Sequence, residues 1–181
     1  GDTASEPVPP RLFLYVGSDD ARIHVFSIAN GTGASTDAGV FDAGVNPSFL
    51  AFSPDQRFVY AVNDATSELA AFAVDASTGA LALLNRAPSN GSGPAHVAVD
   101  ATGGRVLAAN YGGGTVTSVA VQPDGSLGAA VSTLATGANA HQIVVAPDNR
   151  FAFVPNLGSN TVSQLVFDAV TGVLSPNAVP T

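Results

Sequence analysis

The chain has 181 residues, 46% hydrophobic and 11% charged, and its 14 acidic and six basic residues give a formal net charge of −8. This composition suits a folded domain, and it lacks the clustered basic residues that bind nucleic acid or anionic membranes. No apolar run approaches the ~20 residues of a membrane-spanning helix, so membrane insertion is not expected either. Cysteine is absent, which excludes disulfides, thiolate nucleophiles and cysteine-based zinc sites.

The first ten residues, "GDTASEPVPP", are small, polar and rich in proline. This composition predicts a disordered lead-in over residues 1–10. Such a segment often follows a cleaved secretion signal, so we expect a periplasmic or extracellular protein, with a cytoplasmic location as the alternative.

From residue 11 onward the sequence repeats itself. Three similar stretches end at Asn63, Asn110 and Asn156, and these asparagines are 47 and 46 residues apart, a spacing typical of propellers and solenoids. Each repeat contains short runs rich in Val, Phe, Ile, Leu and Thr, separated by Gly, Pro, Asp and Asn, and no run shows sustained helical periodicity. The pattern therefore predicts β-strands and turns.

The strands can be assigned repeat by repeat. The first repeat has three runs, "RLFLYVGS", "RIHVFSIA" and "DAGVFDAG", and each later repeat has four. We predict an all-β fold over residues 11–181, a partial β-propeller with one three-stranded blade and three complete four-stranded blades. The predicted blades span residues 11–46, 47–92, 93–137 and 138–181.

Three stretches carry a resemblance to a known family. "NPSFLAFSPDQRFVYAVND", "GPAHVAVDATGGRVLAANYGGGTVTSVAVQPDGSLG" and "AHQIVVAPDNRFAFVPNLGSN" resemble the lactonase family of seven-bladed β-propellers. That family includes propeller-type 6-phosphogluconolactonases and fungal carboxymuconate-lactonizing enzymes. The strands "YAVN" and "FVPN" also resemble YVTN propeller repeats, which are often not enzymes.

The resemblance carries further expectations. Complete members have about twice as many strands, and their next blade, beyond Thr181, supplies an Arg-His pair and an Asn-Glu pair whose Arg and Glu act in catalysis. We therefore expect this chain to be an N-terminal fragment that is inactive alone. We also expect it to pair with the remainder of its propeller or with a second copy.

Hairpin geometry predicts where a site lies. The first two strands of each repeat form a hairpin, so the start of one strand meets the end of the other. His96 is then near Asn110, and His141 is near Asn156. If the first strand is innermost, these ends ring one mouth of a central channel, where ligands commonly bind.

Two functions are compatible with the sequence. One is a lactonase-like hydrolase of a sugar or small organic-acid lactone, with His141 as candidate general base, since a neutral imidazole accepts a proton from attacking water. The other is a non-catalytic exported propeller that serves as a binding or assembly platform. No cofactor and no metal are expected, and the expected ligand is a small lactone or carbohydrate acid. The candidate ligand-binding residues are Asn63, His96, Asn110, Tyr111, Asn139 and Asn156.

Each candidate also has a structural interpretation. The recurring asparagines can serve turns, because Asn tolerates left-handed backbone and bonds to nearby backbone groups. His96 and His141 can simply line the channel. The glycines after Tyr111, Gly112–Gly114, permit either a ligand-binding loop or a tight strand connection.

Overall fold

The computed structural model describes residues 11–178, and the lead-in predicted for residues 1–10 lies outside this range. The described residues form fifteen β-strands and no helix. Accordingly, no helix in this part of the chain is long and apolar enough to cross a bilayer. The all-β prediction is confirmed.

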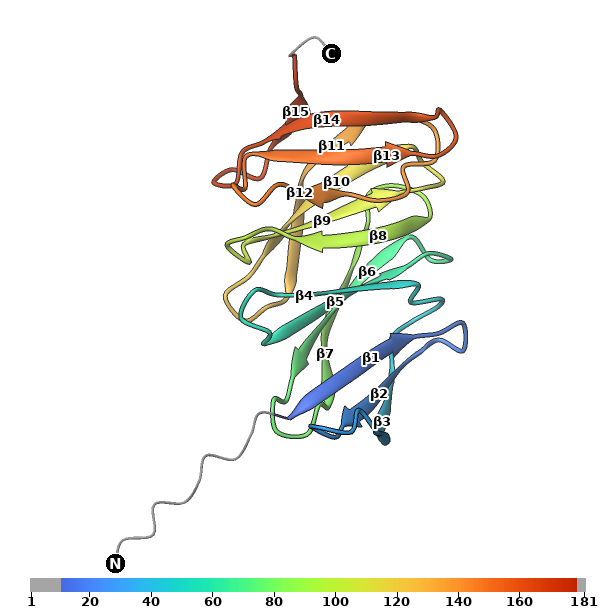
Figure 1. Ribbon diagram of the computed structural model, residues 1–181. Helices are drawn as coiled ribbons and strands as arrows, with labels where there is room; N and C mark the ends of the chain where they lie inside the picture. Colours follow the sequence, from blue (N-terminus) through green and yellow to red (C-terminus); the bar gives the residue numbers. More distant parts are fainter. Residues whose placement is uncertain (1–10, 179–181) are drawn as a thin grey trace, which may run out of the picture.

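The strands form four antiparallel sheets stacked one after another along the chain (Figure 1). We call these sheets blades 1 to 4. Blade 1 contains β1 (Leu12–Gly17), β2 (Arg22–Ile28) and β3 (Ser35–Asp42). Blade 2 contains β4 (Phe49–Phe52), β5 (Phe58–Asn63), β6 (Glu68–Val74) and β7 (Leu81–Pro88). Blade 3 contains β8 (Pro94–Val99), β9 (Arg105–Asn110), β10 (Thr115–Val121) and β11 (Leu127–Ala135), and blade 4 contains β12 (Val144–Val145), β13 (Phe151–Asn156), β14 (Thr161–Phe167) and β15 (Leu174–Pro176).

Each blade is a meander whose neighbouring strands are consecutive in sequence. Short hydrogen-bonded turns connect the consecutive strands. In blade 2 the N–H of Gln56 donates to the carbonyl of Ser53 at 2.9 Å, closing the turn between β4 and β5. Pro54 occupies the second turn position, for which its fixed backbone angle is suited. The N–H of Asn149 closes the equivalent turn of blade 4 on Ala146 at 2.8 Å.

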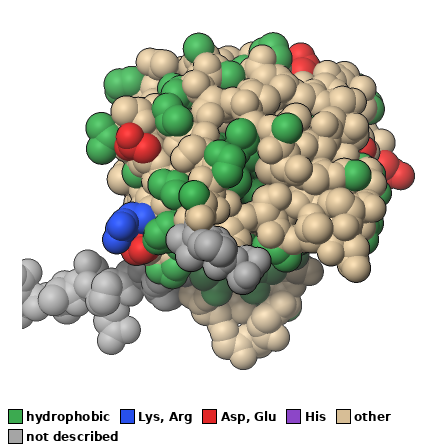
Figure 2. All heavy atoms as spheres, turned by 90° about the horizontal axis from the view of Figure 1, so that it is seen from above, with side chains coloured by type: hydrophobic (Ala, Val, Ile, Leu, Met, Phe, Trp, Pro, Cys, Tyr) green, Lys and Arg blue, Asp and Glu red, His purple; other side chains and the backbone are tan. Residues whose placement is uncertain are grey.

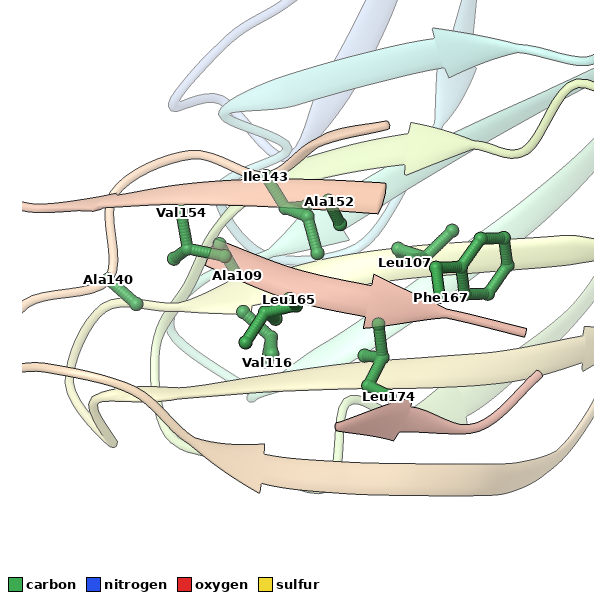
Figure 3. Packing of buried hydrophobic residues seen from close by; sticks show 10 residues of the cluster. All are labelled: Leu107, Ala109, Val116, Ala140, Ile143, Ala152, Val154, Leu165, Phe167 and Leu174. Carbon is green, nitrogen blue, oxygen red and sulfur yellow. The ribbon is translucent and has the colours of Figure 1, made fainter. Parts of the chain in front are cut away.

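The hydrophobic core lies between the blades rather than within one of them. Three clusters fill the three interfaces between consecutive blades. Figure 3 shows the cluster between blades 3 and 4, where Leu107 and Val116 meet Ile143, Leu165 and Phe167. The middle strands are therefore buried on both faces, which explains why their apolar runs are continuous rather than alternating.

Blades 1 and 4 depart from the pattern of blades 2 and 3, in which the inner strand has four or six residues. Blade 1 lacks an inner strand, so β1 is a sheet edge, and its residues Leu12, Leu14 and Val16 are 52%, 49% and 40% exposed. In blade 4 the inner strand β12 has only two residues. This strand begins at Val144, which pairs with Phe153, and Pro155, two residues further along β13, has no N–H to donate and so interrupts the ladder.

Candidate functional site

The inner strand of each hairpin starts where its partner strand ends, as hairpin geometry predicts. Pro94 pairs with Asn110 in blade 3. In blade 4, Ala140 forms a β-bridge with Asn156, and the N–H of His141 donates to the carbonyl of Pro155 at 3.0 Å. His141 and Asn156 are therefore neighbours at one end of the blades, which we call the site end.

A short loop at the site end precedes each of the inner strands β4, β8 and β12. Its third residue is Asn46, Gly93 or Asn139, and all three have left-handed backbone, with φ of 58°, 57° and 59°. Only a few residue types adopt this conformation readily, chiefly Gly and Asn. The loops thus have one shape in three blades, and they fix where the following residues lie.

A glycine begins each of these loops and packs on the asparagine that ends the neighbouring strand. A Cβ placed on Gly91 would lie 2.3 Å from Cγ of Asn110, and one on Gly137 would lie 2.9 Å from Cβ of Asn156. This pairing of a glycine with an asparagine was not predicted from the sequence. Its signal is a glycine 19 residues before each asparagine, which also holds for Gly44.

The three asparagines are buried, with exposed fractions of 0% for Asn63, 0% for Asn110 and 2% for Asn156. The Nδ2 of Asn110 donates to the hydroxyls of Thr115 at 3.1 Å and Thr117 at 3.2 Å. These bonds tie the end of β9 to β10. The geometry favours the structural interpretation for Asn110 and Asn156, as braces of the hairpin ends.

His141 is exposed at the site end and contacts the aromatic ring of Tyr111 from the preceding blade. The two rings meet edge to face, with centroids 5.5 Å apart and an interplanar angle of 87°. The Nδ2 of Asn139 donates to the carbonyl of Tyr111 at 3.4 Å, which joins the loop of blade 4 to blade 3. The structure thus brings together His141, Tyr111 and Asn139 from the predicted set.

His96 lies deeper and is only 8% exposed. Its ring stacks on Phe49 with centroids 4.0 Å apart, and its Nδ1 accepts the N–H of Ile143 at 3.5 Å. Burial, and next the neighbouring charge of His141, lower the pKa of His96 to about 4. This histidine is therefore neutral near pH 7. Through Phe49 and Ile143 it also connects blade 3 with blades 2 and 4.

A pocket of about 550 Å³ opens beside His141 on the outer face of blade 4. Its polar lining includes Gln142 and Asn160, and its apolar lining includes Leu157 and Val162. Uncharged donors and acceptors next to an imidazole suit a small polar molecule. Among the described residues no group of three His, Asp or Glu is placed to hold a metal ion.

A carboxylate that was not among the predicted site residues also lies at the site end. Asp64 follows Asn63 directly, as Tyr111 follows Asn110, so aligning the repeats would have revealed it. Asp64 is half-buried, and one of its oxygens accepts the Nδ2 of Asn46 at 3.5 Å. Its free lone pairs can accept hydrogen bonds from ligand hydroxyls.

The stacked four-stranded meanders and the ring of strand ends define a β-propeller with a candidate site at one mouth of its channel. Residues 13–181 match the family model described as lactonase, 7-bladed β-propeller. The chain therefore belongs to the lactonase family of seven-bladed β-propellers.

Individual relatives agree with this family assignment. The chain is 36% identical to a 6-phosphogluconolactonase of Bacillus subtilis (strain 168) over 114 residues, which are 61% of this chain and 33% of the relative. It is 30% identical to a 6-phosphogluconolactonase of Cronobacter sakazakii (strain ATCC BAA-894) over 150 residues, which are 82% of this chain and 44% of the relative.

A solved structure is similar over most of the chain. The crystal structure of a candidate 6-phosphogluconolactonase from Bacteroides uniformis ATCC 8492 superposes with a TM-score of 0.85 at 28% identity. The match covers 94% of this chain and 54% of that one. The chain thus spans about half the length of this structure, and less than half the length of the two curated relatives.

Proposed function

We propose that the protein contributes to hydrolysis of a small lactone of a sugar or organic acid, with His141 as general base. The observation that carries this proposal is family membership over residues 13–181. The site end supports it, because His141 is exposed beside a pocket with uncharged polar groups. In that position its imidazole can take a proton from water that attacks a lactone carbonyl.

The neighbours of His141 have supporting roles in this proposal. Tyr111 packs edge-on against the imidazole and limits its rotation. Gln142 and Asn160 line the pocket and can bond to ring or hydroxyl oxygens of the ligand. His96 is buried, so we assign it to positioning of the inner strands rather than to ligand contact.

Ligand binding tests the proposal directly. The 181-residue protein is titrated with D-glucono-1,5-lactam, a hydrolysis-resistant lactone analogue, while amide resonances are followed by NMR. We expect shifts at Gln142, Asn160 and Thr161, and weaker binding by the His141→Ala variant. The His24→Ala variant is the matched control, since His24 pairs with Asp20 on blade 1.

A second candidate function is a non-catalytic exported propeller that binds or assembles other molecules. It is favoured by the pocket lining, which contains no cation to stabilise an oxyanion. If neither the lactam nor any member of a panel of aldonic and muconic lactones shifts the pocket resonances, the lactonase proposal fails. The platform role then takes its place.

A further inference from the structure

Blade 3 differs from its two neighbours in the loop that precedes its inner strand. The third loop residue is Asn46 in blade 2 and Asn139 in blade 4, whereas blade 3 has Gly93 at this position. All three residues have the same left-handed backbone, with φ of 58°, 59° and 57°. The backbone conformation therefore does not require the glycine, since asparagine adopts it in the two other blades.

In blade 4 the asparagine side chain fills the space between two turns. The Nδ2 of Asn139 donates to the carbonyl of Tyr111 in blade 3 at 3.4 Å. The Oδ1 of Asn139 lies against Gly158 of its own blade, where an added Cβ would collide with it. A side chain at this loop position thus occupies the junction between neighbouring blades.

In blade 3 the glycine leaves a notch at the same junction, between blades 2 and 3. A Cβ on Gly93 would lie 2.9 Å from Oδ1 of Asp64 in blade 2 and 3.4 Å from the backbone nitrogen of Gly112 in blade 3. Gly93 and Asp64 are half-buried and Gly112 is exposed, so the space between them is open to solvent. We call this space the Gly93 notch.

Hydrogen bonds hold the walls of the Gly93 notch in place. The N–H of Gly93 donates to Oγ of Ser67 in blade 2 at 3.1 Å, and its carbonyl accepts the N–H of Tyr111 at 2.8 Å. The Nδ2 of Asn46 donates to Oδ2 of Asp64 at 3.5 Å, while Oδ1 of this carboxylate faces the notch. The notch is therefore preformed, which lowers the entropic cost of binding a ligand there.

The groups that border the notch select the chemistry of its ligand. A carboxylate accepts hydrogen bonds and repels negative charge, so Asp64 suits a hydroxyl or an ammonium group. A backbone N–H is a donor, which a hydroxyl oxygen can accept and an ammonium group cannot. Because the notch combines Asp64 with the amide of Gly112, a hydroxyl matches both groups.

Tyr111 connects the notch with the candidate base. Its N–H bonds to Gly93, the residue after it is Gly112, and its ring contacts the imidazole of His141 with centroids 5.5 Å apart. The notch and His141 therefore share one neighbour at the site end.

The carboxylate of Asp64 adds a type of group that the pocket beside His141 does not use. Apart from His141, the residues that line this pocket are uncharged. Figure 2 views the molecule from the side of blade 4 and shows many hydrophobic side chains and few charged ones. A charged hydrogen-bond acceptor for the ligand thus comes from blade 2.

We propose that the Gly93 notch binds one hydroxyl group of a sugar lactone. The hydroxyl donates a hydrogen bond to Asp64 and accepts one from the amide of Gly112. This inference rests on the proposed lactonase function and narrows its ligand to hydroxyl-rich, uncharged lactones, because a carboxylated lactone brings a second negative charge toward Asp64. Asp64 is a specificity-determining residue in this proposal and takes no part in proton transfer.

NMR titrations of the 181-residue protein with two lactams test the notch. D-Glucono-1,5-lactam carries hydroxyls, and 2-piperidone has the same ring without them. We expect the glucono lactam to shift the amides of Asp64, Gly93 and Gly112, and 2-piperidone to leave them unchanged. Gly93→Asn fills the notch with the side chain found in the two neighbouring loops. It should weaken binding of the glucono lactam about 10-fold or more, the usual effect of losing a hydrogen bond to a charged group.

Matched variants separate recognition from folding. Asp64→Asn keeps the size of the side chain and removes its charge, so it should weaken binding of the glucono lactam about 5-fold. Asp19→Asn makes the same change in an exposed turn of blade 1 and should bind like the wild type. None of the three variants should change the affinity for 2-piperidone, which a general loss of structure would lower. Thermal unfolding should show that all three are folded.

Two sets of resonances distinguish this inference from the proposed function. If the glucono lactam shifts Gln142 and Asn160 but not the amides of the notch, the notch holds only water and the inference fails, while the lactonase proposal stands. If it shifts the amides of the notch alone, the inference stands and the lactonase proposal fails. Equal affinity of the wild type and Gly93→Asn for the glucono lactam overturns the inference, and the absence of any shift contradicts both.

Discussion

At the scale of single residues, the buried asparagines that end β5, β9 and β13 differ in their hydrogen bonds. Asn110 and Asn156 each find hydroxyl partners five and seven residues later, on the next strand. In blade 2 those positions hold Glu68 and Ala70. Within the described residues neither the amide nitrogen nor the amide oxygen of Asn63 has a hydrogen-bond partner.

Replacing Ala70 by serine should therefore stabilise the protein. Ser163, at the equivalent position, accepts the Nδ2 of Asn156 at 3.0 Å. A hydroxyl at position 70 should satisfy Asn63 and raise the free energy of unfolding by about 1 kcal/mol. Urea denaturation measures the change.

The neighbouring alanine gives a matched control for this substitution. Both alanines are fully buried, but Ala70 belongs to the cluster between blades 1 and 2, at the position equivalent to Ser163, whereas Ala71 belongs to the cluster between blades 2 and 3 on the opposite face of the strand. Ala71→Ser should lower the free energy of unfolding by roughly 1–3 kcal/mol, because its hydroxyl is buried among apolar groups. Equal effects at positions 70 and 71 would contradict the role given to Asn63.

His96 should make the protein less stable in acid. Its pKa is lowered from 6.5 to about 4 in the folded state. Between these values the unfolded chain binds a proton that the folded chain does not, so the free energy of unfolding falls as the pH falls. We expect a loss of roughly 2–4 kcal/mol, nearly complete by pH 4.

Comparing variants isolates this contribution from that of the carboxylates. Denaturation at pH 7 and pH 4.5 should show a smaller loss for His96→Phe, which keeps the stacking on Phe49 but carries no titrating ring. If His96→Phe and the wild type respond equally to pH, the assignment is wrong.

At the scale of strands and turns, a glycine allows close packing between neighbouring blades. Gly125, in the turn between β10 and β11 of blade 3, lies directly against the ring of Phe58 in blade 2. Gly125→Ala adds a methyl against Phe58 and forces alanine into φ of 87°. Gly31→Ala imposes similar backbone strain with no contact. Thermal or urea unfolding should find Gly125→Ala less stable than Gly31→Ala by about 1–3 kcal/mol, the usual effect of overpacking.

The elements also show what sequence patterns predict well. The strands of blades 2 and 3 were predictable because apolar runs and Pro-Asp turns are local signals, read over a few residues. The short β12 was not, because its length depends on Pro155, a residue on the opposing strand. Likewise the buried role of Asn110 depends on hydroxyls of a third strand, and the glycine turns depend on the adjacent blade. Such contacts have no local signature.

At the scale of the whole molecule, the charges are arranged unevenly with respect to the site end. All six basic residues are arginines and lie within the described part of the chain. Arg57 and Arg150 precede β5 and β13, so they lie at the opposite end of those strands from Asn63 and Asn156. No arginine lines the pocket beside His141. Among the described residues, the pocket therefore places no arginine beside the candidate base His141.

This arrangement predicts that the 181-residue protein alone does not accelerate lactone hydrolysis appreciably. Attack on a lactone carbonyl builds negative charge on oxygen, and loss of one group that stabilises such charge typically lowers the rate about 100-fold or more. Proton NMR of D-glucono-1,5-lactone should show the spontaneous rate of ring opening with and without protein, while the lactam analogue still binds. Rapid turnover that His141→Ala abolishes and His24→Ala leaves intact would show instead that this chain carries a complete catalytic site.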